Sequence, residues 1–210
     1  MDQLKTMRVL FVEPPKAFWF VMGEYLPPPL GILLLAAYLE TKNENVEIEV
    51  LDCQAKQLDW DDLERHIEST QPDVVAPGAL ATCNVYTCVR TVELAKKVNQ
   101  DILTVVGGQH FSALAQDSLE RYPEIDVVVR GEGEQPFADP VQAAGEKSSL
   151  SRIDGISFRH KGRIVHNPPL PLIENLDDLP FPGYHFVEDI IGKYHFKMMV
   201  GSEAGYALIE

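Results

Sequence analysis

The sequence is poor in cysteine, and this shortage excludes a disulfide-stabilised scaffold. Only three cysteines occur in 210 residues, Cys53, Cys83 and Cys88. An odd and scattered set is not a disulfide framework and favours a reducing, cytoplasmic environment. The spacing of Cys83 and Cys88 does not match a zinc ribbon, and no second pair completes it. We therefore predict no metal site here and interpret the cysteines as small packing residues.

Basic charge and long apolar runs are also scarce. The chain has 18 Lys and Arg against 32 Asp and Glu, a net charge of −14, without any basic run. This balance argues against a nucleic-acid partner. No apolar run reaches the roughly 18 residues of a membrane span, and the stretch from Leu30 to Leu39 is too short. The first residues lack the apolar stretch of a signal peptide, so we expect a cytoplasmic protein without a membrane span.

The usual catalytic signatures are absent as well. There is no P-loop, no nucleophile elbow and no clustered acid/base pair. The first expected strand ends in Glu13-Pro14-Pro15-Lys16 instead of a G-x-G-x-x-G turn, which disfavours a dinucleotide. Asp52 follows the second expected strand, where such a fold places a ribose-binding carboxylate, but we expect it to cap the strand end. We predict no catalytic residue in this chain.

What the sequence does contain is a regular alternation of strands and helices. Short runs of β-branched residues predict five strands, at residues 8–12, 46–51, 74–76, 102–106 and 125–129. Stretches with helical spacing lie between them, at residues 30–41, 59–69, 85–100 and 112–122. This order forms right-handed βαβ units. The sequence therefore predicts an α/β fold with a five-stranded, parallel, doubly wound sheet of the flavodoxin-like, Rossmann type.

The pattern changes near residue 147. We expect the Rossmann-like domain to span residues 5–147, with a boundary in the polar stretch 145–149. Residues 155–159 and 163–166 flank a Lys-Gly turn and predict a β-hairpin. The proline-rich stretches 168–171 and 176–182 cannot continue a helix or a central strand. Residues 148–210 are thus expected to form a hairpin and an extended linker.

Two strands run directly into glycine-rich turns, and these turns are the most informative feature of the chain. Glycine allows positive φ and lets a ligand approach the main chain closely. Open α/β sheets bind ligands at the carboxyl ends of their strands, so two such exits predict a binding edge. The alternative is that these glycines only turn strands into loops. The candidate binding residues at the two exits are Gly107, Gly108, Gln109, His110, Gly131, Glu132, Gly133 and Glu134.

The long loop from Pro14 to Pro29 is unusual for a connection between a strand and a helix. It carries Phe18, Trp19, Phe20, Met22 and Tyr25. Loops of this length are often binding loops or lids. Packing of these aromatic side chains on the core or on a neighbouring domain is an equally good explanation.

Read together and in order, the motifs resemble a known family. They are residues 9–15, 29–40, 71–75, 105–110, 130–134 and 176–182. In these motifs the chain is similar to the N-terminal cobalamin-binding domain of the cobalamin-dependent radical S-adenosylmethionine enzymes. These enzymes include methyltransferases and the anaerobic magnesium-protoporphyrin monomethyl ester cyclase. The resemblance covers essentially the whole chain.

The resemblance implies that cobalamin lies on the carboxyl ends of the strands, with its nucleotide tail beside Gly107 and Gly108. It adds the loop after the third strand and one proline to the candidate cofactor-binding residues, namely Pro14, Ala79, Leu80, Thr82 and Asn84. It also implies a 4Fe–4S cluster and S-adenosylmethionine in a radical domain of the same polypeptide. The C-x3-C-x2-C motif of that domain is not present here, so we expect a fragment that ends before it and is not catalytic alone.

The chain departs from the pattern of other cobalamin domains in two places. Those domains carry D-x-H-x-x-G after the first strand, and its histidine ligates cobalt, whereas residues 13–16 contain no histidine. This implies base-off cobalamin without a histidine below the metal. Gly78 stands where a serine or threonine is often found, so either Thr82 supplies that hydroxyl or the contact is absent. The remaining alternatives are a packing or interaction domain without its cofactor, and a site for flavin or a nucleotide.

Overall fold

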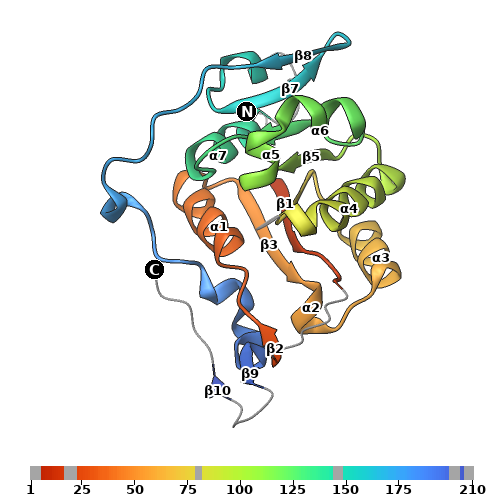
Figure 1. Ribbon diagram of the computed structural model, residues 1–210, viewed down its shortest axis with the longest axis vertical. Coiled ribbons are helices and arrows are strands. Elements are labelled where there is room, and N and C mark those ends of the chain that lie inside the picture. Colours follow the sequence, from red (N-terminus) through yellow and green to blue (C-terminus); the bar gives the residue numbers. More distant parts are fainter. Residues whose placement is uncertain (1–5, 17–22, 79–81, 144–148, 199–203, 206–210) are drawn as a thin grey trace.

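The computed structural model describes residues 6–16, 23–78, 82–143, 149–198 and 204–205, and its main element is a seven-stranded sheet (Figure 1). The strand order is β3-β1-β4-β5-β6-β7-β8. The first five strands pair in parallel and have the spatial order typical of flavodoxin-like folds. The predicted five-stranded parallel sheet is confirmed. The parallel strands are β1 Met7–Glu13, β3 Val46–Asp52, β4 Val74–Pro77, β5 Leu103–Val106 and β6 Val127–Val129.

The predicted β-hairpin forms and extends this sheet. It consists of β7 Ile156–His160 and β8 Arg163–His166, and β7 pairs antiparallel with β6. The hairpin, which belongs to the segment 148–210, therefore completes the sheet of the expected Rossmann-like domain, residues 5–147. The boundary between residues 147 and 148 stays a prediction.

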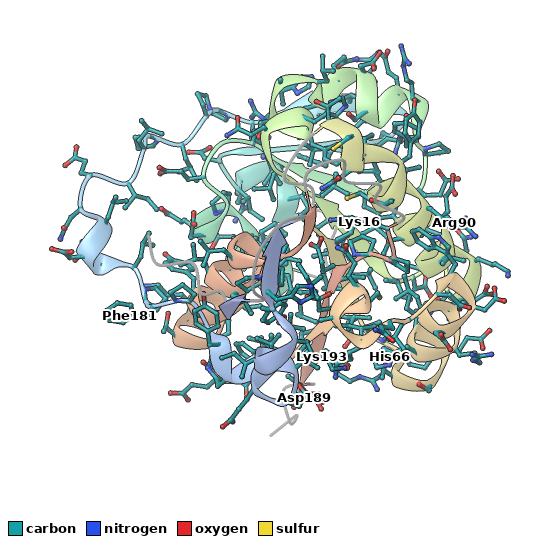
Figure 2. All side chains as sticks on the ribbon, turned by 60° about the horizontal axis from the view of Figure 1, so that its bottom comes forward. Lys16, His66, Arg90, Phe181, Asp189 and Lys193 are labelled. Atoms are coloured by element: carbon teal, nitrogen blue, oxygen red, sulfur yellow. The ribbon has the colours of Figure 1, made fainter. Side chains whose placement is uncertain are left out.

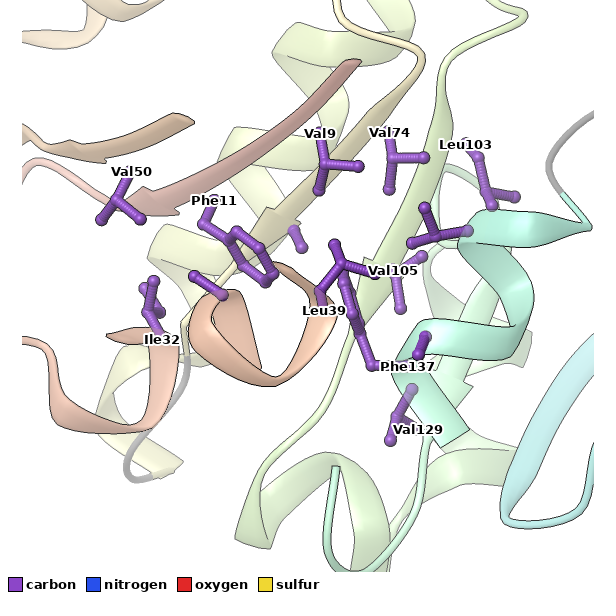
Figure 3. Close-up of a cluster of buried hydrophobic side chains, with 14 of the residues drawn as sticks. Val9, Phe11, Ile32, Leu39, Val50, Val74, Leu103, Val105, Val129 and Phe137 are labelled. Carbon is purple, nitrogen blue, oxygen red and sulfur yellow. The ribbon is translucent and has the colours of Figure 1, made fainter. Parts of the chain in front are cut away.

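Side chains of the strands alternate between two buried layers, which is why helices cover both faces. Val9 and Phe11 of β1 join the cluster that also contains α1 Leu30–Lys42 and α7 Glu134–Gln142 (Figure 3). Leu10 and Val12 point to the opposite face. There they pack with α3 Trp60–Thr70 and with the C-terminal half of α4 Val85–Val98. The core thus follows from the period-two pattern of the strands.

Three local expectations need correction. The helix expected at residues 112–122 is two helices, α5 Gln109–Ala113 and α6 Ala115–Arg121, since Leu114 has non-helical φ and ψ of −122° and 37°. The glycine-rich turn expected at Gly131 to Glu134 already contains the start of α7 at Glu134. A short helix, α2 Cys53–Lys56, follows β3 directly and was not expected.

The segment after the proline-rich stretches folds back onto the domain. It forms the 3-10 helical segment η4 Tyr184–Lys193. Val187, Ile190 and Tyr194 thereby join the core cluster that contains Val9, Phe11, α1 and α7. It then enters a small sheet of β2 Gly23–Leu26, β9 His195–Met198 and β10 Ala204–Gly205, with β9 central and antiparallel to both neighbours. Figure 1 shows this blue segment passing along one side of the domain to reach β2. The expected extended linker therefore ends before residue 183.

Along the preceding stretch, the linker exposes apolar side chains. Leu172, Leu176 and Phe181 are exposed, and the Phe181 side chain at 92% exposure lies at the periphery in Figure 2. Among the described residues, no helix is both long enough and apolar enough to cross a membrane.

Candidate cofactor site

The loops predicted to bind a ligand all leave the same edge of the sheet. Parallel strands place their carboxyl ends together, so the segments after β1, β4, β5 and β6 are neighbours in space. The register pairs Val12 with Pro77 and Val106 with Val128, which aligns these exits. The gap between β1 and β4 is the topological switch point of the sheet, because the connections from these strands run in opposite directions.

The structure explains the glycine at one of the two positions after β5 but not at the other. Gly108 precedes α5 with φ of 89° and ψ of 180°, a conformation that is essentially restricted to glycine. The turn alone therefore explains Gly108. Gly107 has no positive φ, and a Cβ added to it would lie 3.4 Å from the backbone oxygen of Val129, an ordinary contact. Neither the backbone nor the packing requires glycine at position 107, so close approach of a ligand remains a reason for it.

Thr82 and His110 were predicted from separate loops, and the structure brings them together. Thr82 begins the 3-10 turn η1 Thr82–Asn84 after β4, and His110 lies in the first turn of α5. The Oγ1 atom of Thr82 lies 3.3 Å from Nδ1 of His110. Thr82 is exposed and His110 is half-buried, and so both polar groups are within reach of a ligand at this edge.

The other predicted residues of these loops differ in how exposed they are. Gln109 is exposed beside His110, whereas Asn84 is buried and its Oδ1 accepts a hydrogen bond from Sγ of Cys83 at 3.3 Å. Pro14 is buried at the end of β1. Ala79 and Leu80 lie outside the described residues.

Two residues of the motif after β6, Arg130 and Glu132, form hydrogen bonds with the hairpin and the linker. Nη2 of Arg130 donates to the backbone oxygens of Ile156, at 3.1 Å, and Asn167. Oε2 of Glu132 accepts a hydrogen bond from the backbone N–H of Ile173 at 2.6 Å. These contacts anchor the hairpin and the linker, and sequence reasoning missed them because the partners lie far along the chain.

The remaining residues of this motif stay at the edge. Gly131 has φ of 79°, and its N–H donates to Oγ of Ser112 at 3.0 Å. Gly133 is the N-cap of α7, where a Cβ would lie 3.0 Å from Cδ2 of Leu35. Oε2 of Glu134 is buried and has no hydrogen-bond partner within the described parts of the chain. Such a buried acceptor requires a donor from beyond the described residues.

A second polar cluster, which the sequence did not predict as a site, lies at the ends of β1 and β3. Oε1 of Glu13 accepts a hydrogen bond from Nε2 of Gln54 at 3.0 Å and pairs with Nζ of Lys16. Burial raises the pKa of the Glu13 carboxyl above its usual value, while the nearby Lys16 ammonium lowers it. Figure 2 places Lys16 over the body of the domain, away from its rim.

Asp52, which was expected to cap the end of its strand, is the N-cap of α2, a helix that was not expected. Its Oδ1 accepts the backbone N–H of Ala55 at 2.9 Å, and its Oδ2 accepts the hydroxyl of Tyr194 at 3.1 Å. Burial raises the pKa of this carboxyl too. The hydrogen bond to Tyr194 joins the C-terminal segment to the carboxyl edge.

The cysteines do not form a reactive or metal-binding group. Cys53 and Cys88 are buried as packing residues, and burial raises the pKa of each thiol to about 12, which keeps it protonated. Cys83 is exposed, contrary to the packing expectation. In the ranges that the structure describes, no three His, Cys, Asp or Glu residues are grouped for a metal ion.

The parallel sheet with glycine-rich exits defines an open α/β domain with a cofactor edge at its switch point. Residues 22–141, more than half of the chain, match the family described as the B12 binding domain. The chain belongs to this family, which confirms the resemblance and the expected cobalamin-binding module. The readings as a packing domain without cofactor, or as a flavin or nucleotide site, are not favoured.

Curated relatives support the same assignment. The chain is 34% identical over 183 residues to an uncharacterized methyltransferase of Pyrococcus horikoshii, covering 86% of this chain and 39% of that protein. It is 33% identical over 177 residues to the anaerobic magnesium-protoporphyrin IX monomethyl ester cyclase of Rubrivivax gelatinosus, covering 81% of this chain and 31% of the cyclase. The chain therefore spans well under half the length of these relatives.

Solved structures show the same fold. The cobalamin-dependent S-adenosylmethionine radical enzyme OxsB with aqua-cobalamin bound aligns with a TM-score of 0.68 at 20% identity, over 88% of this chain and 25% of that chain. The radical S-adenosylmethionine methyltransferase TsrM of Kitasatospora setae, with cobalamin and a 4Fe–4S cluster bound, aligns with a TM-score of 0.64 at 23% identity. That alignment covers 85% of this chain and 31% of TsrM.

Proposed function

We propose that this domain holds base-off cobalamin on the carboxyl edge of its sheet and serves a radical S-adenosylmethionine enzyme. In that protein, a further domain of the same polypeptide holds the 4Fe–4S cluster and S-adenosylmethionine and carries out methyl transfer or radical ring formation. The names of the relatives support this assignment, since they describe methyltransferases and an anaerobic cyclase. One relative is named a cobalamin-dependent radical SAM methyltransferase.

The observation that carries the proposal is the arrangement around Gly107. Gly107 is half-buried at the sheet edge, and neither its φ nor its packing requires a glycine. The polar pair of Thr82 and His110 lies on the neighbouring loops. An edge that combines an accessible backbone with hydrogen-bonding side chains fits the long nucleotide tail and the amide-bearing rim of cobalamin.

Within this proposal, the residues of the chain bind and orient the cofactor. Gly107 and Gly108 would give the tail access to the main chain, and Thr82 and His110 would offer hydrogen bonds. Oε2 of Glu134, which has no hydrogen-bond partner among the described residues, would accept a donor from the ligand. When bound, the cobalt supplies the site that carries the reactive group, while the protein sets its position and surroundings.

The direct test is to mix the purified chain with hydroxocobalamin, desalt it and record the visible spectrum. We expect the cofactor to stay with the protein in roughly equimolar amount. Flavin mononucleotide, treated in the same way, is the matched ligand control and should be removed by desalting. A colourless protein that gives no heat in titration calorimetry with cobalamin would instead support the packing role.

A further inference from the structure

The carboxyl group of Glu13 lies in the gap between the ends of β1 and β4. Glu13 is the last residue of β1, and the register that pairs Val12 with Pro77 brings it beside Gly78, the first residue after β4. A Cβ added to Gly78 would lie 3.2 Å from Oε2 of Glu13 and 2.8 Å from Cδ1 of Ile32. A side chain at position 78 would therefore require the buried Ile32 side chain to shift. The carboxylate of Glu13 lies beside the space that such a side chain would need.

One of the two carboxylate oxygens of Glu13 already accepts hydrogen bonds within the protein. The hydrogen bonds that it receives from Gln54 and Lys16 both end on Oε1. The side chain is only 15% exposed, so its orientation is fixed by these partners and by the strand. Oε2 is the oxygen that faces Gly78.

The backbone N–H and oxygen of Gly78 both form hydrogen bonds within the protein. Its N–H donates to the backbone oxygen of Val12 at 2.9 Å, and its own oxygen accepts a hydrogen bond from Sγ of Cys88 at 2.9 Å. The glycine therefore has neither a side chain nor an N–H to offer a ligand at this position. Glu13 supplies the polar side chain at the switch point of the sheet.

We propose that Glu13 is a ligand-binding residue whose Oε2 accepts a hydrogen bond from an N–H or O–H donor of bound cobalamin. Gln54 and Lys16 are positioning residues, because they fix Oε1 and leave Oε2 directed at the gap. This inference rests on the proposed cobalamin function and adds a contact to it. The donor is either an amide of the corrin ring or a hydroxyl of the nucleotide tail.

The test compares two ligands and two variants by visible titration. Dicyanocobinamide keeps the ring amides but lacks the nucleotide tail, whereas cyanocobalamin has both. Glu13→Gln keeps the shape of the side chain and removes the charged acceptor. Glu47→Gln is the matched control, since Glu47 is an exposed residue near the amino end of β3.

For Glu13→Gln we expect cyanocobalamin to bind about tenfold or more weakly, the usual effect of losing a hydrogen bond to a charged acceptor. Glu47→Gln should bind like the wild type. An equal loss for dicyanocobinamide assigns the donor to a ring amide, and a loss for cyanocobalamin alone assigns it to the tail. Unchanged affinity for both ligands overturns the proposal.

Thermal unfolding without ligand separates binding from folding. If Glu13→Gln does not fold, Glu13→Asp replaces it, because this change keeps the charge beside Lys16 but withdraws Oε2 from the gap. Wild-type affinity in Glu13→Asp would then overturn the inference, and a loss of several-fold would support it. A wild-type chain that binds no cobalamin would instead contradict the proposed function itself.

Discussion

The hydroxyl of Tyr194 donates a hydrogen bond to Oδ2 of Asp52 at 3.1 Å, although 142 positions separate the two residues. Both side chains are buried, with 3% and 0% exposure. Asp52 ends β3 at the carboxyl edge, and Tyr194 immediately precedes β9, which pairs with β2. Through this bond the C-terminal segment is tied to the edge that carries the cofactor loops.

Removing the Tyr194 hydroxyl should therefore destabilise the domain. Tyr194→Phe leaves Oδ2 of Asp52 buried without this donor, which costs about 1–3 kcal/mol. Urea denaturation followed by circular dichroism measures the change. Tyr86→Phe is the control, because the Tyr86 side chain is 77% exposed, and it should stay within about 0.5 kcal/mol of the wild type. Equal stability of the two variants would contradict a stabilising role for the buried bond.

Asp52 should also give the stability a recognisable pH dependence. Burial raises the pKa of its carboxyl, although the hydrogen bonds from Ala55 and Tyr194 act in the opposite direction. The folded chain then binds this proton more tightly than the unfolded chain. The favourable contribution is present at pH below the ordinary pKa and is lost as the pH rises through the raised one.

Asp52→Asn keeps a side-chain acceptor for the N-cap but cannot ionise. We expect the difference in unfolding free energy between wild type and Asp52→Asn to shift against the wild type as the pH is raised from about 4, the ordinary pKa of aspartate, into the neutral range. Denaturation curves of both proteins across this range provide the measurement. Parallel pH profiles would show that the Asp52 pKa is not raised in the folded state.

Much of the parallel sheet could be predicted from the sequence, because its signals are local. Runs such as Val127–Val129 are β-branched and are followed within two residues by a glycine, so both the strand and its exit are visible in a few residues. The helix α7 was missed because Pro136 and Pro140 argue against a helix, yet Pro136 lies in its first turn, where no intrahelical N–H is needed. The pairing of β2 with β9 has no local signal, since its strands are far apart in the sequence.

The candidate site likewise contains residues with a local sequence signal and residues whose role depends on a distant partner. His110 could be predicted because it follows a strand at the carboxyl edge, whereas Thr82 was implied by the family resemblance, and the structure brings the two to 3.3 Å. The role of Glu132 depends on the backbone of Ile173, and that of Glu13 depends on Gln54. Both partners are 41 positions away, and a residue's own neighbourhood does not identify such a partner.

Gly108 and Gly107 should respond differently to the same added methyl group. Gly108→Ala forces an L side chain into φ of 89° and ψ of 180°, which costs about 1–3 kcal/mol with or without a ligand. Gly107→Ala makes only an ordinary contact with Val129 and should leave stability nearly unchanged. Thermal unfolding of the two variants without cofactor measures this difference, and an equal loss in both would contradict it.

This difference also affects how binding is tested. We expect Gly108→Val to abolish cobalamin binding, but part of its effect would come from the strained backbone. Gly107→Ala, which is expected to fold normally, is the cleaner probe of close approach. A tenfold or greater loss of cobalamin affinity in this variant would support contact at the turn. Wild-type affinity would indicate that the ligand does not press on Gly107.

The last prediction concerns the lower axial ligand of the cobalt, which we expect not to be a histidine of this chain. Residues 13–16, at the end of β1, contain Glu13 and Lys16, and these two side chains pair with one another. His110 follows β5 instead, where Nδ1 lies near Thr82 and the ring packs edge-on against Phe111. Electron paramagnetic resonance of the bound cob(II)alamin form should show no nitrogen superhyperfine splitting, and His110→Ala should give the same spectrum. A triplet splitting would reveal a nitrogen ligand and contradict the prediction. Its loss in His110→Ala would identify the donor as His110, and its persistence would point to another nitrogen, such as the cofactor's own base.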